Sequence, residues 1–247
     1  MRIVVIGGSG LIGTKLVARL AAQGHAAIAA SPRSGVDTLT GKGLDAALDG
    51  ADAVVDVANS PRLDGDAALD FFQRSGRRLL AAAAAAGIRH HVVLSIVGTD
   101  RLQENAYFRA KQAQEALVRA SGLSHSILRA TQFFEFLAGI ADAMTVDGRV
   151  TVPVAPFQPM AAEDVAAALA EVVAAPPRDA IIEAAGPERA PFADFVARLL
   201  RAMGDPRPVL ADPRARYFGA AIDDRSLVPD AAAWRGPTRF ADWLARA

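Results

Sequence analysis

Two side chains that can move a proton lie one helical turn apart near the middle of the chain. In the run Tyr107-Phe108-Arg109-Ala110-Lys111, the spacing of four residues places the phenol and the ammonium on one face of a predicted helix. A phenol with a pKa of about 10 is a slow acid or base at neutral pH unless a nearby ammonium stabilises its phenolate. The pair therefore suits protonation of the alkoxide that forms when a hydride reduces a carbonyl. The alternative is an aromatic residue at a helix start and a surface lysine paired with Glu115.

A nucleotide-binding turn is predicted at the start of the chain. Residues 2–6 read as a buried strand, and Gly7, Gly10 and Gly13 follow at three-residue spacing before an amphipathic helix. Gly7 permits the turn, Gly10 leaves room for a pyrophosphate, and Gly13 lets the helix pack on the strand. The helix N-terminus would hold the phosphates, although glycines also form ordinary turns. The same predicted cofactor site includes Ser9, Leu11 and Ile12.

The residues after the second predicted strand, 26–30, favour NADP(H) over NAD(H). An NAD-binding domain usually carries an Asp or Glu about twenty residues after the glycines, where it accepts a hydrogen bond from the ribose 2′-hydroxyl. Here that position holds Ser31, Arg33 and Ser34 instead. A guanidinium beside hydroxyl groups suits a 2′-phosphate, and no carboxylate repels it. The alternative is a solvated loop arginine.

Polar side chains follow two further predicted strands at the edge where a doubly wound sheet binds its ligand. Ala58 ends the strand at 52–58, and Asn59, which follows it, either contacts a cofactor ribose or caps the turn before Pro61. Ser95 ends the strand at 91–96. The order of these elements predicts a Rossmann-type α/β fold with a doubly wound parallel sheet.

The glycine triplet, Ser95 and the Tyr107–Lys111 pair resemble the short-chain dehydrogenase/reductase superfamily, which combines GxxGxxG, a serine on the fourth strand and a YxxxK helix. The run from Leu94 to Phe134 is similar to the atypical, NmrA-like or NAD(P)H-binding branch. The resemblance implies that Tyr107 is the general acid/base, that Lys111 stabilises it and contacts the nicotinamide ribose, and that Ser95 orients the substrate carbonyl. Alanines at 81–86 replace the asparagine that many of these reductases use in a proton relay. Some members of this branch bind NADP and act as redox sensors without turnover.

An apolar substrate pocket is predicted where the fifth strand, 124–130, runs into a group of aromatic residues. Phe133 and Phe134 are expected to form its walls, although such aromatics are also typical of a core. The other predicted pocket residues are Val97, Thr131 and Met160. We expect a Rossmann core over residues 1–150 and a small C-terminal α/β substrate lobe over 151–247 that interleaves with it.

The composition limits the partners. The 27 basic and 27 acidic residues balance, so no overall field attracts nucleic acid or an acidic membrane surface. The chain has no cysteine, which fits a cytoplasmic protein and excludes thiolate chemistry. The histidines do not cluster at ligand spacing, so no metal site is expected. We expect a monomer or homodimer that binds a small-molecule substrate but no nucleic acid and no membrane.

Together these features predict an NADP(H)-dependent oxidoreductase that acts on a small, apolar carbonyl, quinone or alcohol. Two alternatives stay open at this point: a non-catalytic NADP sensor of the NmrA type, and a nucleotide-sugar epimerase or dehydratase of the same fold.

Overall fold

The fold is built on a central parallel sheet. The computed structural model describes residues 1–62 and 65–246. The sheet has seven strands in the order β12-β9-β5-β4-β3-β1-β2, and all neighbours are parallel. The strands are β1 (Arg2–Ile6), β2 (Ala26–Ala30), β3 (Ala53–Asp56), β4 (His90–Ile96), β5 (His125–Ala130), β9 (Ala180–Ala185) and β12 (Trp234–Arg235). The predicted Rossmann-type α/β class is confirmed.

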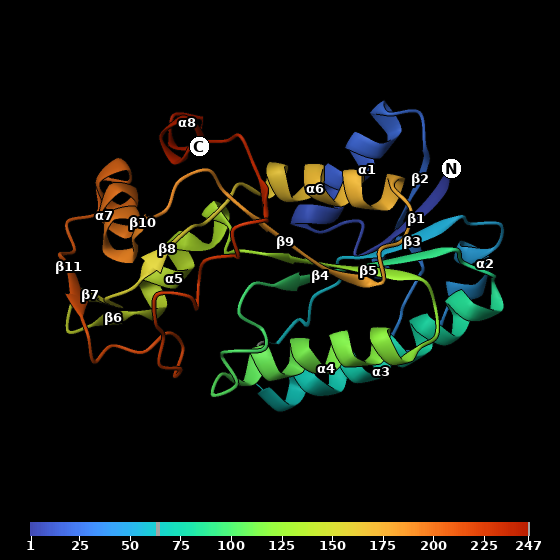
Figure 1. Cartoon of the computed structure of the whole chain (residues 1–247), viewed down its shortest axis with the longest axis horizontal. Coiled ribbons are helices and arrows are strands. Elements are labelled where there is room, and N and C mark those ends of the chain that lie inside the picture. The colour runs from blue at the N-terminus through green and yellow to red at the C-terminus, as the bar shows by residue number, and fades with distance from the viewer. Residues whose placement is uncertain (63–64, 247) are drawn as a thin grey trace.

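Helices cover both faces of the sheet because the side chains of each buried strand alternate between two cores. Ile3 and Val5 of β1 pack with α1 (Leu11–Ala22) and α6 (Ala162–Ala174). Val4 and Ile6 point to the opposite face, where they pack with α2 (Leu44–Leu48) and α3 (Gly65–Ala85). Figure 1 shows the sheet nearly edge-on, with α1 and α6 above it and α3 and α4 (Ala106–Ala120) below it.

A smaller lobe lies beyond the carboxyl ends of the central strands (Figure 1). Its core is aromatic: the rings of Phe157 and Phe192 stack 4.3 Å apart, and Phe240 packs against Phe134 and Phe195. The lobe comprises a 3₁₀ turn at Phe134–Phe136, the helices α5 (Leu137–Ala143), α7 (Phe192–Ala202) and α8 (Phe240–Leu244), and the strands β6 (Thr145–Val146), β7 (Arg149–Pro153), β8 (Pro156–Phe157), β10 (Ala190–Pro191) and β11 (Val209–Asp212).

The chain passes between core and lobe more than once. Of the elements after residue 150, α6, β9 and β12 belong to the central sheet and its helical cover. A division at residue 150 therefore cuts through the core. In the part of the chain that the structure describes, no helix is both long and apolar enough to cross a membrane.

The strand order places a topological switch point beside β1. β1 lies between β2 and β3, so the chain leaves the carboxyl end of β1 toward one side of the sheet and that of β2 toward the other. Doubly wound sheets bind ligands outside the carboxyl ends of the strands at such a switch point. The glycine turn and Asn59 both lie at this edge.

Candidate functional site

The glycine turn joins β1 to α1 without side chains. Gly7 adopts a φ of 79°, and a Cβ there would lie 2.8 Å from the Ala58 amide nitrogen. A Cβ on Gly13 would lie 2.2 Å from the Gly7 carbonyl oxygen, so the fold itself requires both glycines. A Cβ on Gly10 would meet only that same oxygen, at 3.3 Å. Gly10 is the N-cap residue of α1, whose first N–H groups have no intrahelical partners. The turn thus leaves space and donors for a phosphate.

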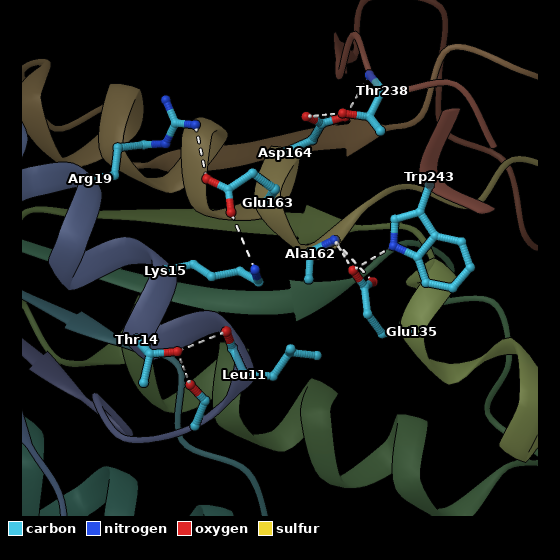
Figure 2. A network of polar contacts seen from close by, with 11 residues as sticks. Leu11, Thr14, Lys15, Arg19, Glu135, Ala162, Glu163, Asp164, Thr238 and Trp243 are labelled. Carbon is cyan, nitrogen blue, oxygen red and sulfur yellow. Dashed lines mark hydrogen bonds and ion pairs between the residues drawn. The ribbon is translucent and has the colours of Figure 1, made fainter. Parts of the chain in front are cut away.

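Other members of the predicted cofactor site surround this turn. Ser9 and Leu11 are exposed beside Gly10, whereas the side chain of Ile12 is buried in the core under α1. The Thr14 hydroxyl donates to the Gly10 carbonyl oxygen over 2.9 Å and steadies the first turn of α1 (Figure 2). Only the backbone of Ile12 is therefore placed to contact a ligand here.

The loop after β2 presents one free cation. A 3₁₀ turn at Pro32–Ser34 follows the strand, and the Ser34 hydroxyl accepts from the Ser31 amide and donates to the Ala29 carbonyl. These bonds fix the turn and engage the Ser34 hydroxyl within the loop. Arg33 is exposed and forms no ion pair among the described residues. Its guanidinium is thus available to an anion beyond the end of β2.

Tyr107 lies in the first turn of α4 and faces the end of β3. Asn105 caps this helix, because its side-chain oxygen accepts from the backbone N–H groups of Tyr107 and Phe108. The Tyr107 hydroxyl donates to Asn59 Oδ1 over 2.6 Å. Burial raises the pKa of Tyr107 to about 12, against the opposing effect of the hydrogen bond with Asn59. The phenol is therefore a neutral proton donor at neutral pH.

Asn59 both caps its own turn and contacts Tyr107. Its Oδ1 accepts from the Ser60 amide over 2.9 Å as well as from the phenol. The Asn59 side chain is exposed, and its amide nitrogen has no hydrogen-bond partner among the described residues. That nitrogen remains a donor for a ligand at the switch point.

Lys111 is buried, contrary to the alternative of a surface lysine. Its ammonium donates to the Leu94 carbonyl oxygen over 2.8 Å and to Gln114 Oε1, and it lies 4.6 Å from the centre of the Phe72 ring. Two of the three ammonium hydrogens are thus used within the protein. Burial lowers the pKa of Lys111 to about 8, and the charges of Asp56 and Glu115 oppose this shift.

Ser95 does not join this pair. Leu94 packs toward α1 and α6, so alternation along β4 turns Ser95 toward α4. There its hydroxyl donates to Glu115 Oε1 over 2.6 Å, and the buried Glu115 forms a bidentate ion pair with Arg129. No hydrogen bond of the described residues connects Ser95 to Tyr107 or Lys111. The expected carbonyl orienter is therefore committed to a structural ion pair.

Four buried polar residues were not predicted as site residues, although the surface-lysine alternative named Glu115 as the partner of Lys111. Asp56, Gln114, Glu115 and Arg129 are each at least nine-tenths buried and form hydrogen bonds around Ser95 and Lys111. Helical spacing was the available signal for two of them, because residues three and four positions after Lys111 share its face. For Asp56, the signal was a carboxylate within an otherwise apolar strand.

The predicted pocket walls are mostly core side chains. Phe134 is 1% exposed and packs against Phe240 and Trp243, with ring centres 4.9 and 5.6 Å away. This places Phe134 in the lobe core and not on a pocket wall. Val97 and Met160 are likewise fully buried. Thr131 is buried too, and its hydroxyl has no hydrogen-bond partner among the described residues.

Phe133 is the one predicted wall residue that stays near the surface. It is partly buried and stacks on Phe136, a residue that is 50% exposed, with 5.4 Å between the ring centres. The two rings form an apolar surface just after the carboxyl end of β5. No group of three metal-ligating side chains occurs among residues 1–62 and 65–246.

Polar contacts around α6 hold the core and the lobe together (Figure 2). Glu163 on α6 pairs with Lys15 and Arg19 of α1 at 3.3 and 3.2 Å. Glu135 accepts from the backbone N–H of Ala162, at the start of α6, and from the Trp243 indole nitrogen of α8. These contacts position α1, and with it the glycine turn, relative to the lobe.

The open glycine turn and the switch point beside it are typical of a dinucleotide-binding protein. Residues 7–176 match the profile of the NAD(P)H-binding family. The chain belongs to this NAD(P)H-binding family.

Several known proteins are similar to the chain. It is 31% identical over 223 residues to (4-alkanoyl-5-oxo-2,5-dihydrofuran-3-yl)methyl phosphate reductase of Streptomyces griseus, over 83% of this chain and 74% of that protein. A structure of MoeE5 with UDP-glucose and NAD aligns with a TM-score of 0.72 and 20% identity, over 99% of this chain and 96% of the other. An NADPH-dependent quinone oxidoreductase of Escherichia coli aligns with a TM-score of 0.70 and 17% identity, over 99% and 98%. At such identities, these structures establish a shared fold.

Proposed function

We propose that the protein is an NADP(H)-dependent reductase of a small, apolar carbonyl or quinone, able to oxidise the corresponding alcohol in reverse. The observation that carries the proposal is the neutral Tyr107 phenol, held by Asn59 at the switch point and four residues from a buried ammonium. The relative that reduces an alkanoyl furanone phosphate and the quinone oxidoreductase of the same fold support a conjugated carbonyl compound as substrate.

Tyr107, Lys111 and Asn59 would each have a distinct role in the reaction. When bound, the reduced nicotinamide supplies a hydride to the substrate carbon. Tyr107 donates its proton to the substrate oxygen, and the Lys111 charge stabilises the phenolate that remains. The Asn59 amide nitrogen, which is free in the described structure, donates a hydrogen bond to the ligand. We assign no contact with the substrate to Ser95, because Glu115 already accepts from its hydroxyl.

The cofactor preference would rest on Arg33. The residues present fit a phosphorylated dinucleotide: Gly10 and the α1 N-terminus suit the pyrophosphate, and the unpaired Arg33 suits a 2′-phosphate. Arg33→Ala should weaken NADPH binding about 5- to 150-fold, which corresponds to about 1–3 kcal/mol, and leave NADH binding nearly unchanged. Arg119→Ala, on an exposed arginine in the last turn of α4, is the matched control. Equal losses for both cofactors would contradict the assignment.

A turnover assay tests the activity itself. Purified protein is mixed with NADPH and a panel of ketones, aldehydes, enones and quinones, and the cofactor absorbance is followed. The chain has two tyrosines, so Tyr217→Phe, in the lobe core, is the control for Tyr107→Phe. Tyr107→Phe should lower kcat about 100-fold or more and keep NADPH binding, whereas Tyr217→Phe should keep kcat. A fully active Tyr107→Phe variant would eliminate the assigned acid.

A non-catalytic NADP sensor is the second candidate. The observations that support it are the engagement of Ser95 by Glu115 and the alanines in place of a relay asparagine. A sensor predicts that binding distinguishes NADP from NADPH and that no compound of the panel is turned over. Calorimetry with both cofactor forms, run beside the turnover assay, separates the two functions.

A further inference from the structure

Asp56 is a buried carboxylate with two hydrogen-bond partners: Ala58, next to the residue that binds Tyr107, and Gln114, which binds Lys111. It ends β3, directly before the turn that carries Asn59, and is 5% exposed. Its Oδ1 accepts from the Ala58 amide over 3.0 Å, and its Oδ2 accepts from Gln114 Nε2 over 2.9 Å. One oxygen therefore serves the turn and the other serves α4.

Gln114 connects this carboxylate to Lys111. Its side chain is 2% exposed, donates to Asp56 through Nε2 and accepts from the Lys111 ammonium through Oε1. The polarity of the amide is set at both ends, because a carboxylate only accepts and an ammonium only donates. Gln114 thus transmits the position of Asp56 to Lys111.

The turn 56–59 connects the same carboxylate to Tyr107. The Asp56–Ala58 bond fixes the turn, and Asn59, the next residue, accepts from the Tyr107 hydroxyl over 2.6 Å. Two separate hydrogen bonds therefore tie the end of β3 to α4, one at Tyr107 and one at Gln114.

We propose that Asp56 and Gln114 are positioning residues that hold Tyr107 and Lys111 in register with the switch point and stabilise the Lys111 charge. The inference rests on the proposed function, since it gives the two residues a purpose in the same site. Burial raises the pKa of Asp56, while the Ala58 amide, the Lys111 charge and the Gln114 amide oppose that shift.

The electrostatic surroundings of Lys111 define what a substitution changes. Asp56 on β3 and Glu115 on α4 are the anions that act on its ammonium. On the remaining sides, α3 presents the neutral Phe72 ring and β4 the Leu94 carbonyl. Arg129 on β5 is paired with Glu115. On α4 itself, Tyr107 has a pKa of about 12 and is therefore neutral over the pH range in which Lys111 titrates.

An exchange of the two side-chain types gives a sharp test. Asp56→Asn leaves one acceptor oxygen for two donors, the Ala58 amide and Gln114 Nε2, so one of these contacts is lost, or Gln114 reverses and loses its contact with Lys111. Adding Gln114→Glu restores every donor–acceptor pair: the new carboxylate accepts from the new amide and from Lys111, and the total charge returns. In this double variant the anion contacts the ammonium directly.

The titration of Lys111 reports the outcome without substrate. The chain has three lysines, Lys15, Lys42 and Lys111, so ¹³C-labelled lysine NMR resolves each one, and Lys111→Met assigns its signal. The titration midpoint of Lys111 should fall in Asp56→Asn and should rise above the wild-type value in the double variant. An unchanged midpoint in Asp56→Asn, or a midpoint in the double variant no higher than in the single one, overturns the inference. If Asp56→Asn does not fold, a Lys111 midpoint in the double variant at or below the wild-type value overturns the inference.

Kinetics then separate the inference from the proposed function. Asp56→Asn should lower kcat about 10- to 100-fold with little change in KM, and the double variant should recover most of that loss. The double variant should also shift the alkaline limb of the pH profile of kcat/KM to higher pH. If the Lys111 midpoints move as expected but the protein turns over no substrate, the reductase proposal is wrong and the positioning role stands. If the protein turns over substrate but the midpoints do not move, the positioning role is wrong and the reductase proposal stands.

Discussion

Glu115→Ala should be the most destabilising substitution near the site. The Glu115 side chain is fully buried and accepts three hydrogen bonds: from Ser95 Oγ at 2.6 Å, and from Arg129 Nε and Nη2 at 2.9 and 2.8 Å. Its removal leaves the Arg129 guanidinium, 5% exposed, with only Asp100 as an ionic partner, at 3.0 Å. The Asp100 side chain is itself 46% exposed and compensates poorly.

The size of the loss follows from the charge that is left behind. Breaking a buried ion pair by removing one partner costs about 3–5 kcal/mol, since the other charge stays desolvated. A single domain is stable by only about 5–15 kcal/mol, so Glu115→Ala should unfold at a much lower urea concentration. Glu115→Leu combined with Arg129→Met should lose far less, because an apolar pair of similar volume leaves no charge unpaired.

A surface carboxylate provides the control. Glu163 also meets two cations, Lys15 and Arg19, but its side chain is 52% exposed, so Glu163→Ala should cost less than about 1 kcal/mol. Urea denaturation followed by circular dichroism measures all four proteins. If Glu115→Ala loses no more stability than Glu163→Ala, the argument from burial is wrong.

Three further predictions test the site. Ser95→Ala should lower the unfolding free energy by about 1–3 kcal/mol, through the lost bond to Glu115, and reduce kcat far less than the about 100-fold typical of a lost oxyanion donor; denaturation and turnover measure the two effects. The pKa of Lys111 is about 8 in the folded chain against 10.5 ordinarily, so the unfolded chain binds more protons between pH 8 and 10.5. The unfolding free energy of the wild type relative to that of Lys111→Met should therefore rise with pH across that window. A difference that stays flat or falls would contradict the lowered pKa. Gly13→Ala should destabilise by about 1–3 kcal/mol, because its Cβ would lie 2.2 Å from the Gly7 oxygen, whereas Gly139→Ala, in open space on α5, should gain about 0.5–1 kcal/mol; thermal unfolding compares the pair.

The glycine turn could be predicted because the motif is continuous in the chain. The atoms nearest a Cβ on Gly13 would be those of Gly7 and Gly8, whereas the close contacts of Gly7, with Val57 and Ala58, come from a distant segment. The pairing of Tyr107 and Lys111 could be predicted as well, because their common helix face follows from their spacing alone. Their burial does not follow, since it depends on how α4 packs against β4 and α3.

Ser95 shows where sequence reasoning ends. Its position near the carboxyl end of β4 is as predicted, but its direction depends on strand parity and on which helix covers each face. A side chain one position along β4 would point to the opposite side of the sheet. The partner that captures its hydroxyl, Glu115, comes from a helix that follows the strand, and no local pattern announces the contact.

The inward face of α4 carries a physical argument about function. Lys111, Gln114 and Glu115 are buried there, where apolar side chains would pack at least as stably. Both carboxylate oxygens of Glu115 accept a hydrogen bond from the Arg129 guanidinium, so this pair needs no ligand to satisfy it. The Lys111 ammonium instead retains a hydrogen that no described residue accepts, at the end of a chain of bonds from Asp56. A buried polar network that stays open at one end costs stability without a ligand, and the ligand that closes it would have to bind beside Tyr107.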